Sequence, residues 1–91
     1  MSVSVRIPTT LRTLTAGKSE VATDGSTVRD VLANLDKAHP GFSDRLLDED
    51  GNLRRFVNVF VADDDIRFLN GLDTPVPEGE TVSIIPAVAG G

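Results

Sequence analysis

Residues 55–62 read Arg55-Phe56-Val57-Asn58-Val59-Phe60-Val61-Ala62, and this stretch decides the fold. Three valines alternate with phenylalanine and asparagine along it. A period of two predicts a β-strand with one buried face. We expect the valines to face a helix and Phe60 to project from the opposite face of the sheet.

Outward from this stretch, shorter runs predict the remaining strands. Alternation of apolar and polar residues predicts a strand over 2–7, which Pro8 ends because proline cannot donate to a sheet ladder. Further strands are expected at 18–23, 66–68 and 81–85, with loops at 9–17 and 72–80 and turns at 48–52 and 63–64.

One amphipathic helix follows the second strand. Four apolar residues recur at positions i, i+3, i+4 and i+7, namely Val28, Val31, Leu32 and Leu35. Ser26 is the expected N-cap, His39-Pro40-Gly41 ends the helix, and residues 41–47 can add a short helical turn. The element order predicts an α+β fold, with a mixed sheet wrapped around one main helix.

Composition narrows the class of protein. The chain has 91 residues, a net charge of −5 and no cysteine. Nucleic acid and anionic membranes are therefore unexpected partners, because both bind basic surfaces. The first residues lack the apolar core of a signal peptide, and no stretch is long enough to cross a bilayer. We expect a cytoplasmic protein.

The residues needed for catalysis or metal binding are scarce. His39 is the single histidine, and its place at a helix end favours interaction with the helix dipole over catalysis. With no cysteine and no second histidine, neither a Cys-His nor a Ser-His-Asp arrangement is favoured. Residues 48–52 resemble the start of a calcium loop, but the required glycine falls on Leu53 and the required glutamate on Val59. No phosphate-binding glycine loop is present. We expect no metal site, no bound cofactor and no enzyme activity.

The C-terminal residues Ala87-Val88-Ala89-Gly90-Gly91 have small side chains and finish on two glycines. Residues without a Cβ can thread a narrow slot, and Gly91 would present a free carboxylate at the tip. Activation of that carboxylate as an acyl-adenylate would open it to a sulfur or nitrogen nucleophile. The chain is thus divided into a domain at 1–86 and a flexible arm at 87–91. An ordinary frayed terminus is the alternative reading.

Two outward apolar residues suggest where a partner docks. Phe60 and Ile85 are expected on the face of the sheet turned away from the helix, near the arm. Large exposed apolar residues favour a docking patch. The alternative is that loops half-cover both side chains.

The sequence resembles the MoaD/ThiS family of ubiquitin-like sulfur carriers over its whole length. Beside residues 55–61, the resemblance is carried by Asp65-Ile66-Arg67-Phe68, Gly71-Leu72-Asp73-Thr74-Pro75-Val76 and Pro86-Ala87-Val88-Ala89-Gly90-Gly91. Leu11-Arg12 and Arg45-Leu46-Leu47-Asp48 are similar to the actinobacterial cysteine-biosynthesis branch, the CysO type.

The resemblance implies a ubiquitin-like β-grasp fold and a thiocarboxylate, or 1-thioglycine, at Gly91. It implies an ATP-dependent, ubiquitin-activating-like adenylyltransferase and sulfurtransferase as the activating partner. It further implies a pyridoxal-phosphate cysteine synthase as sulfur acceptor and a metal-dependent peptidase that releases cysteine. Molybdopterin, thiamin and sulfur-containing secondary metabolites remain open as destinations. A ubiquitin-like modifier joined to lysines through Gly91, and the small subunit of molybdopterin synthase, are the alternatives.

Overall fold

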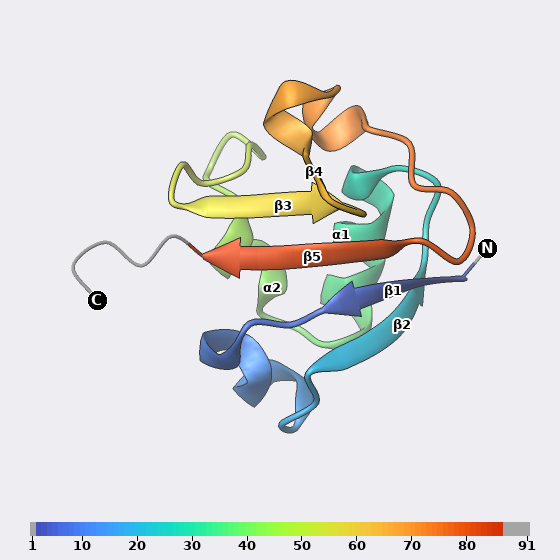
Figure 1. Ribbon diagram of the computed structural model, residues 1–91. Helices are drawn as coiled ribbons and strands as arrows, with labels where there is room; N and C mark the ends of the chain where they lie inside the picture. The colour runs from blue at the N-terminus through green and yellow to red at the C-terminus, as the bar shows by residue number, and fades with distance from the viewer. Residues whose placement is uncertain (1, 87–91) are drawn as a thin grey trace.

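Five strands form one mixed sheet in the computed structural model, which describes residues 2–86 (Figure 1). The strand order is β2-β1-β5-β3-β4. β1 and β5 are parallel, and the other neighbouring strands are antiparallel. The strands are β1 (Ser2–Arg6), β2 (Glu20–Asp24), β3 (Val57–Val61), β4 (Asp64–Asp65) and β5 (Thr81–Pro86).

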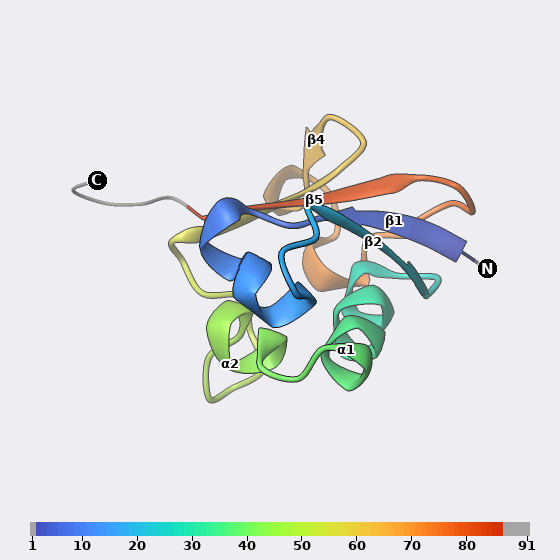
Figure 2. The same ribbon diagram turned by 90° about the horizontal axis from the view of Figure 1, so that it is seen from below.

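Two helices, α1 (Val28–Ala38) and α2 (Phe42–Leu46), lie against one face of this sheet (Figure 2). The predicted apolar stripe of α1 is confirmed, since all four of its residues are buried. The valines of β3 are buried opposite it, also as predicted. A curved sheet around one main helix is the β-grasp arrangement. Neither helix within residues 2–86 is long and apolar enough to cross a bilayer.

The N-cap of α1 is Thr27, so the prediction of Ser26 is wrong by one residue. The Thr27 hydroxyl oxygen accepts a hydrogen bond from the amide of Asp30 at 3.2 Å. Ser26 instead donates to the Asp30 carboxylate at 3.1 Å. Both hydroxyls are thus used around the first turn, and the extended backbone of Thr27 is the geometry an N-cap requires.

The predicted strand at 66–68 is wrong, because these residues form a 3₁₀ helix, η2 (Ile66–Phe68). Ile66 is 1% exposed and Phe68 is 87% exposed. In a strand these two side chains would share one face, whereas the helical turn separates them. The Asp65 carboxylate caps this turn by accepting from the Arg67 amide at 2.9 Å.

Short helices also interrupt the predicted loops. A 3₁₀ helix, η1 (Thr9–Thr15), occupies most of the predicted loop 9–17. Another, η3 (Gly71–Asp73), overlaps the beginning of the predicted loop 72–80. β2 begins at Glu20 rather than at Lys18. The buried Thr15 hydroxyl donates to the Lys18 carbonyl at 2.8 Å, which holds Lys18 in the turn before the strand.

Asp36 of α1 supplies the cap that α2 lacks. The residue before α2 is Gly41, which has no side chain and a φ of 113°. The Asp36 carboxylate accepts from the Ser43 amide at 3.0 Å and from the Gly41 amide at 3.2 Å. The Ser43 amide is the strongest of the contacts that lower the pKa of Asp36, and burial acts in the opposite direction.

We expect Asp36→Asn to lower the free energy of unfolding near neutral pH. A carboxyl whose pKa is lower in the folded state stabilises the fold above its unfolded pKa of about 3.9. That contribution is lost as pH falls through the folded pKa, so the gap between wild type and Asp36→Asn should narrow in acid. Urea melts across a pH series measure the gap, and a constant gap would exclude this role.

Candidate functional site at the end of strand β5

β5 lies in the middle of the sheet and is the last element of the described domain. It pairs with β1 on one side and with β3 on the other. Its last residue, Pro86, is opposite Val57 at the start of β3. The predicted arm residues Val88, Ala89, Gly90 and Gly91 lie outside the described residues. The described part of the chain thus ends at Pro86, directly before the predicted arm.

The outer face of the sheet, turned away from α1, carries Phe60 and Ile85 close to this base. Phe60 is opposite Ser83, and Asn58 is opposite Ile85. The two apolar residues are therefore diagonal neighbours on adjacent strands, within reach of large side chains. Ile85 is 49% exposed, while Phe60 is half-buried. Figure 2 shows both helices on the opposite side of the sheet.

Two hollows on the outer face differ in their lining. A shallow hollow of about 140 Å³ beside Ile85 has a mainly apolar lining, in which Ile7, Pro8 and Ile84 lie beside Arg6 and Ser83. Farther from the end of β5, a hollow of about 380 Å³ is bordered by charged residues of both signs, including Arg6, Glu20, Asp63 and Glu80. Apolar side chains thus gather at the C-terminal end of β5 and charged side chains toward its start.

Three other exposed apolar residues were not predicted as candidates. Phe56 is 51% exposed, Phe68 is 87% exposed and Leu69 is 46% exposed. The alternation of residues 55–61 already separated Phe56 from the buried valines, so that signal was available. No such signal existed for Phe68, whose exposure depends on the 3₁₀ turn that replaced the predicted strand.

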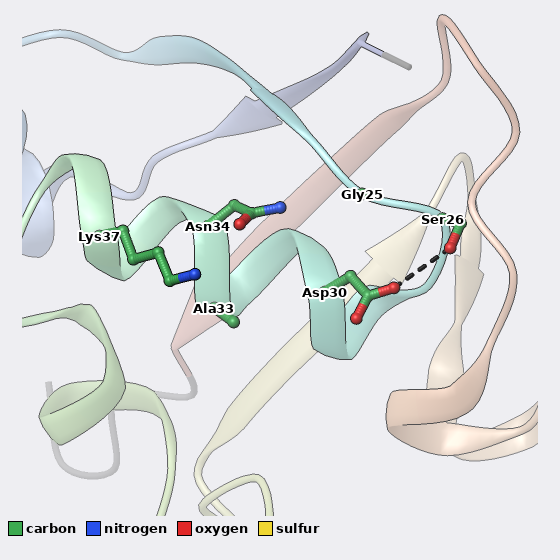
Figure 3. A pocket seen from close by; sticks show the side chains of 6 residues that line it. All are labelled: Gly25, Ser26, Asp30, Ala33, Asn34 and Lys37. Atoms are coloured by element: carbon green, nitrogen blue, oxygen red, sulfur yellow. Dashed lines mark hydrogen bonds between the residues drawn. The ribbon is translucent and has the colours of Figure 1, made fainter.

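The hollow beside the start of α1 has a volume of about 390 Å³ (Figure 3). Asp30 is hydrogen-bonded to Ser26, and Asn34 donates to the Asp24 carbonyl at 2.8 Å. Lys37 and Ala33 complete the wall contributed by α1. The lining contains no histidine or cysteine that could act as a base or nucleophile, and its acid and amide already have partners. Its polar groups serve the connection between β2 and α1.

Side chains that could ligate a metal are dispersed over the described part of the chain. Among residues 2–86, no cluster of three His, Cys, Asp or Glu side chains could hold a metal ion. The single histidine, His39, ends α1 as predicted.

Comparison with known proteins identifies the family. The model of the ThiS family matches residues 5–91. The chain belongs to the ThiS family. This ThiS-family chain is 46% identical to the sulfur carrier protein CysO of Mycobacterium tuberculosis over 93 residues, and the match covers 100% of both chains. It is also 36% identical, with 100% of both chains covered, to small archaeal modifier protein 3 of Haloferax volcanii.

Solved structures confirm the β-grasp fold of this ThiS-family chain. The crystal structure of the BexX/CysO complex of Amycolatopsis orientalis contains a chain that superposes with a TM-score of 0.92 at 46% identity. That match covers 98% of this chain and 99% of the other. The predicted membership of the MoaD/ThiS family and the predicted fold are therefore both confirmed.

Proposed function

We propose that this chain is a sulfur carrier protein, which serves as a substrate of other enzymes and carries sulfur as a thiocarboxylate on Gly91. The observation that carries the proposal is the 46% identity to the sulfur carrier protein CysO over the full length of both chains. The fold supports it, because a central strand paired on both sides gives the arm a rigid base.

The proposed chemistry has two steps. A carboxylate oxygen of Gly91 attacks the α-phosphorus of ATP on a partner adenylyltransferase, which releases pyrophosphate and leaves an acyl-adenylate. Hydrosulfide, or an equivalent sulfur nucleophile, then attacks the acyl carbon, and AMP leaves as the thiocarboxylate forms. We assign later steps to a cytoplasmic, pyridoxal-phosphate cysteine synthase as acceptor and to a metal-dependent peptidase that frees the product.

The experiment that tests this function is intact-mass spectrometry of the full chain. Incubation with the cognate activating enzyme, ATP and sulfide should raise the mass by the difference between sulfur and oxygen, and omission of ATP should prevent the change. Absence of sulfur on Gly91 in the complete mixture would refute the proposal.

A second candidate function is protein modification through Gly91. It is favoured by the 36% identity to small archaeal modifier protein 3. Both functions begin with the acyl-adenylate, but in modification a lysine amine attacks the acyl carbon. Gly-Gly remnants on lysines of other proteins, found in digests of the native host, would identify this second function.

We assign docking of the activating enzyme to Phe60 and Ile85 on the outer face. Ile85→Asp and Phe60→Asp should each weaken the complex by about tenfold or more, because a charge would enter a desolvated contact. Calorimetric titration with the activating enzyme measures the loss.

Ala22→Asp is the matched control, since it adds the same charge to the same face on the edge strand β2. Urea melts should show that all three variants fold. If Phe60→Asp unfolds the protein, Phe60 belongs to the core. If Ile85→Asp binds as tightly as wild type, the docking surface lies elsewhere.

A further inference from the structure

A pocket on a different part of the domain contains two arginines above an apolar floor. Its volume is about 270 Å³, and it lies between α1, the segment after α2 and the two 3₁₀ helices η2 and η3. We call it the two-arginine pocket. It is lined by Arg29, Asn52, Leu53, Ile66, Arg67, Gly71 and Leu72.

Arg67 is held in place by the edge of β3. Its Nη2 donates to the carbonyl of Arg55 at 2.9 Å and to the carbonyl of Val57 at 2.8 Å. Both protons of Nη2 are then engaged with neutral acceptors, while Nε and Nη1 have no hydrogen bond within residues 2–86. The guanidinium charge is therefore fixed in position without being neutralised by a carboxylate.

Arg29 supplies the second positive charge from α1. Its Nε lies 3.4 Å from a carboxylate oxygen of Asp73, and the two side chains are 56% and 75% exposed. An exposed pair of this kind contributes little, and it leaves both terminal nitrogens of Arg29 available. In a chain with a net charge of −5, two arginine residues thus line one small pocket.

Apolar groups form the floor and the surroundings of the pocket. Ile66 and Leu72 are buried, and Leu53 packs against the core. Phe68 and Leu69 follow Arg67 directly in the chain, and they are 87% and 46% exposed. Exposed large apolar residues beside a cationic pocket are typical of a surface that binds another protein.

We propose that the two-arginine pocket binds an acidic side chain of a partner protein, with a neighbouring apolar residue of that partner packed on Phe68 and Leu69. Bidentate pairing with the two terminal nitrogens of Arg29 favours a carboxylate, and Arg67 adds a fixed positive charge. The aliphatic floor accommodates the methylene groups of the acidic side chain. This site lies apart from the Phe60 and Ile85 face and does not depend on sulfur transfer. The chain thus has a second interaction surface, selective for an acidic-apolar segment.

The test uses nuclear magnetic resonance of the full chain titrated with the capped pentapeptide Gly-Leu-Glu-Leu-Gly. The amides of Arg29, Leu53, Arg67 and Leu72 should shift and saturate, with a dissociation constant on the order of 1 mM. The matched peptide with glutamine in place of glutamate should bind about tenfold more weakly, because it lacks the charge-assisted hydrogen bonds. Added salt should weaken the binding.

Variants separate the pocket from the fold. Arg29→Gln should weaken the glutamate peptide severalfold, whereas Arg45→Gln, in an exposed arginine of α2 outside the pocket, should leave binding unchanged. Arg67→Gln is the less clean variant, since it also removes the two hydrogen bonds to β3.

Three outcomes would overturn the proposal. Equal binding of the two peptides would show that charge is not recognised. Shifts at Phe60 and Ile85 instead would place the binding on the outer face. If removal of residues 88–91 shifts the amide signals of the pocket in the absence of peptide, the chain's own terminus is the occupant.

Discussion

Deleting Gly91 is expected to abolish adenylation of the chain, although Gly90 would still end in a carboxylate. The shortened chain falls short by one residue, up to about 3.6 Å. Misplacement of reacting groups by even 1 Å can cost about a hundredfold in rate. Appending one residue after Gly91 should also abolish adenylation, because the reactive carboxyl becomes a peptide bond. Gly90→Val should do so by adding a branched side chain where a narrow passage is expected.

ATP–pyrophosphate exchange with the cognate activating enzyme measures this effect. Ala89→Gly is the matched control, since it keeps the chain length and adds no bulk, and it should retain exchange. All variants should melt like wild type, because the core cluster lies within residues 3–84. Full exchange with Gly91 deleted would refute both the carrier and the modifier function.

Phe42→Ala should destabilise the domain by about 3–5 kcal/mol. Phe42 is 0% exposed and is the largest of the fully buried side chains of residues 2–86. Its removal would leave a cavity between α2 and the rest of the core. The free energy of unfolding of a native protein is only about 5–15 kcal/mol, so this variant should lose much of its stability.

Phe68→Ala is the control that removes the same atoms from a side chain that is 87% exposed. It should change the free energy of unfolding by no more than about 0.5 kcal/mol. Urea denaturation of both variants gives the comparison. Equal destabilisation by the two substitutions would contradict the assignment of Phe42 to the core.

The elements with a complete periodic signal were predictable from the sequence. β3 and α1 each have a buried face long enough to show its period, and both lie within two residues of the predicted ranges. The outward placement of Ile85 followed from the same alternation. The family was predictable from several short motifs spread along the chain.

The sequence was insufficient where local and long-range contacts compete. Three residues, Ile66 to Phe68, are too few to separate a strand period from a 3₁₀ turn, and the Asp65 cap decides between them. The two-arginine pocket unites Arg29 with Arg67, far apart in the chain, and only the packing of η2 and η3 places them together. The arm, residues 87–91, remains a prediction from sequence and family.

The position of β5 has a mechanical consequence. β1 and β5 run parallel, so Ser2 and Pro86 lie at opposite ends of the pair (Figure 1). Tension between these two points would load the ladder in shear, and its hydrogen bonds would have to break together rather than one by one. Forced unfolding is governed by the unfolding rate, which such a geometry slows. Another protein that pulls on the C-terminal end would therefore apply force in the direction in which the fold resists unfolding most.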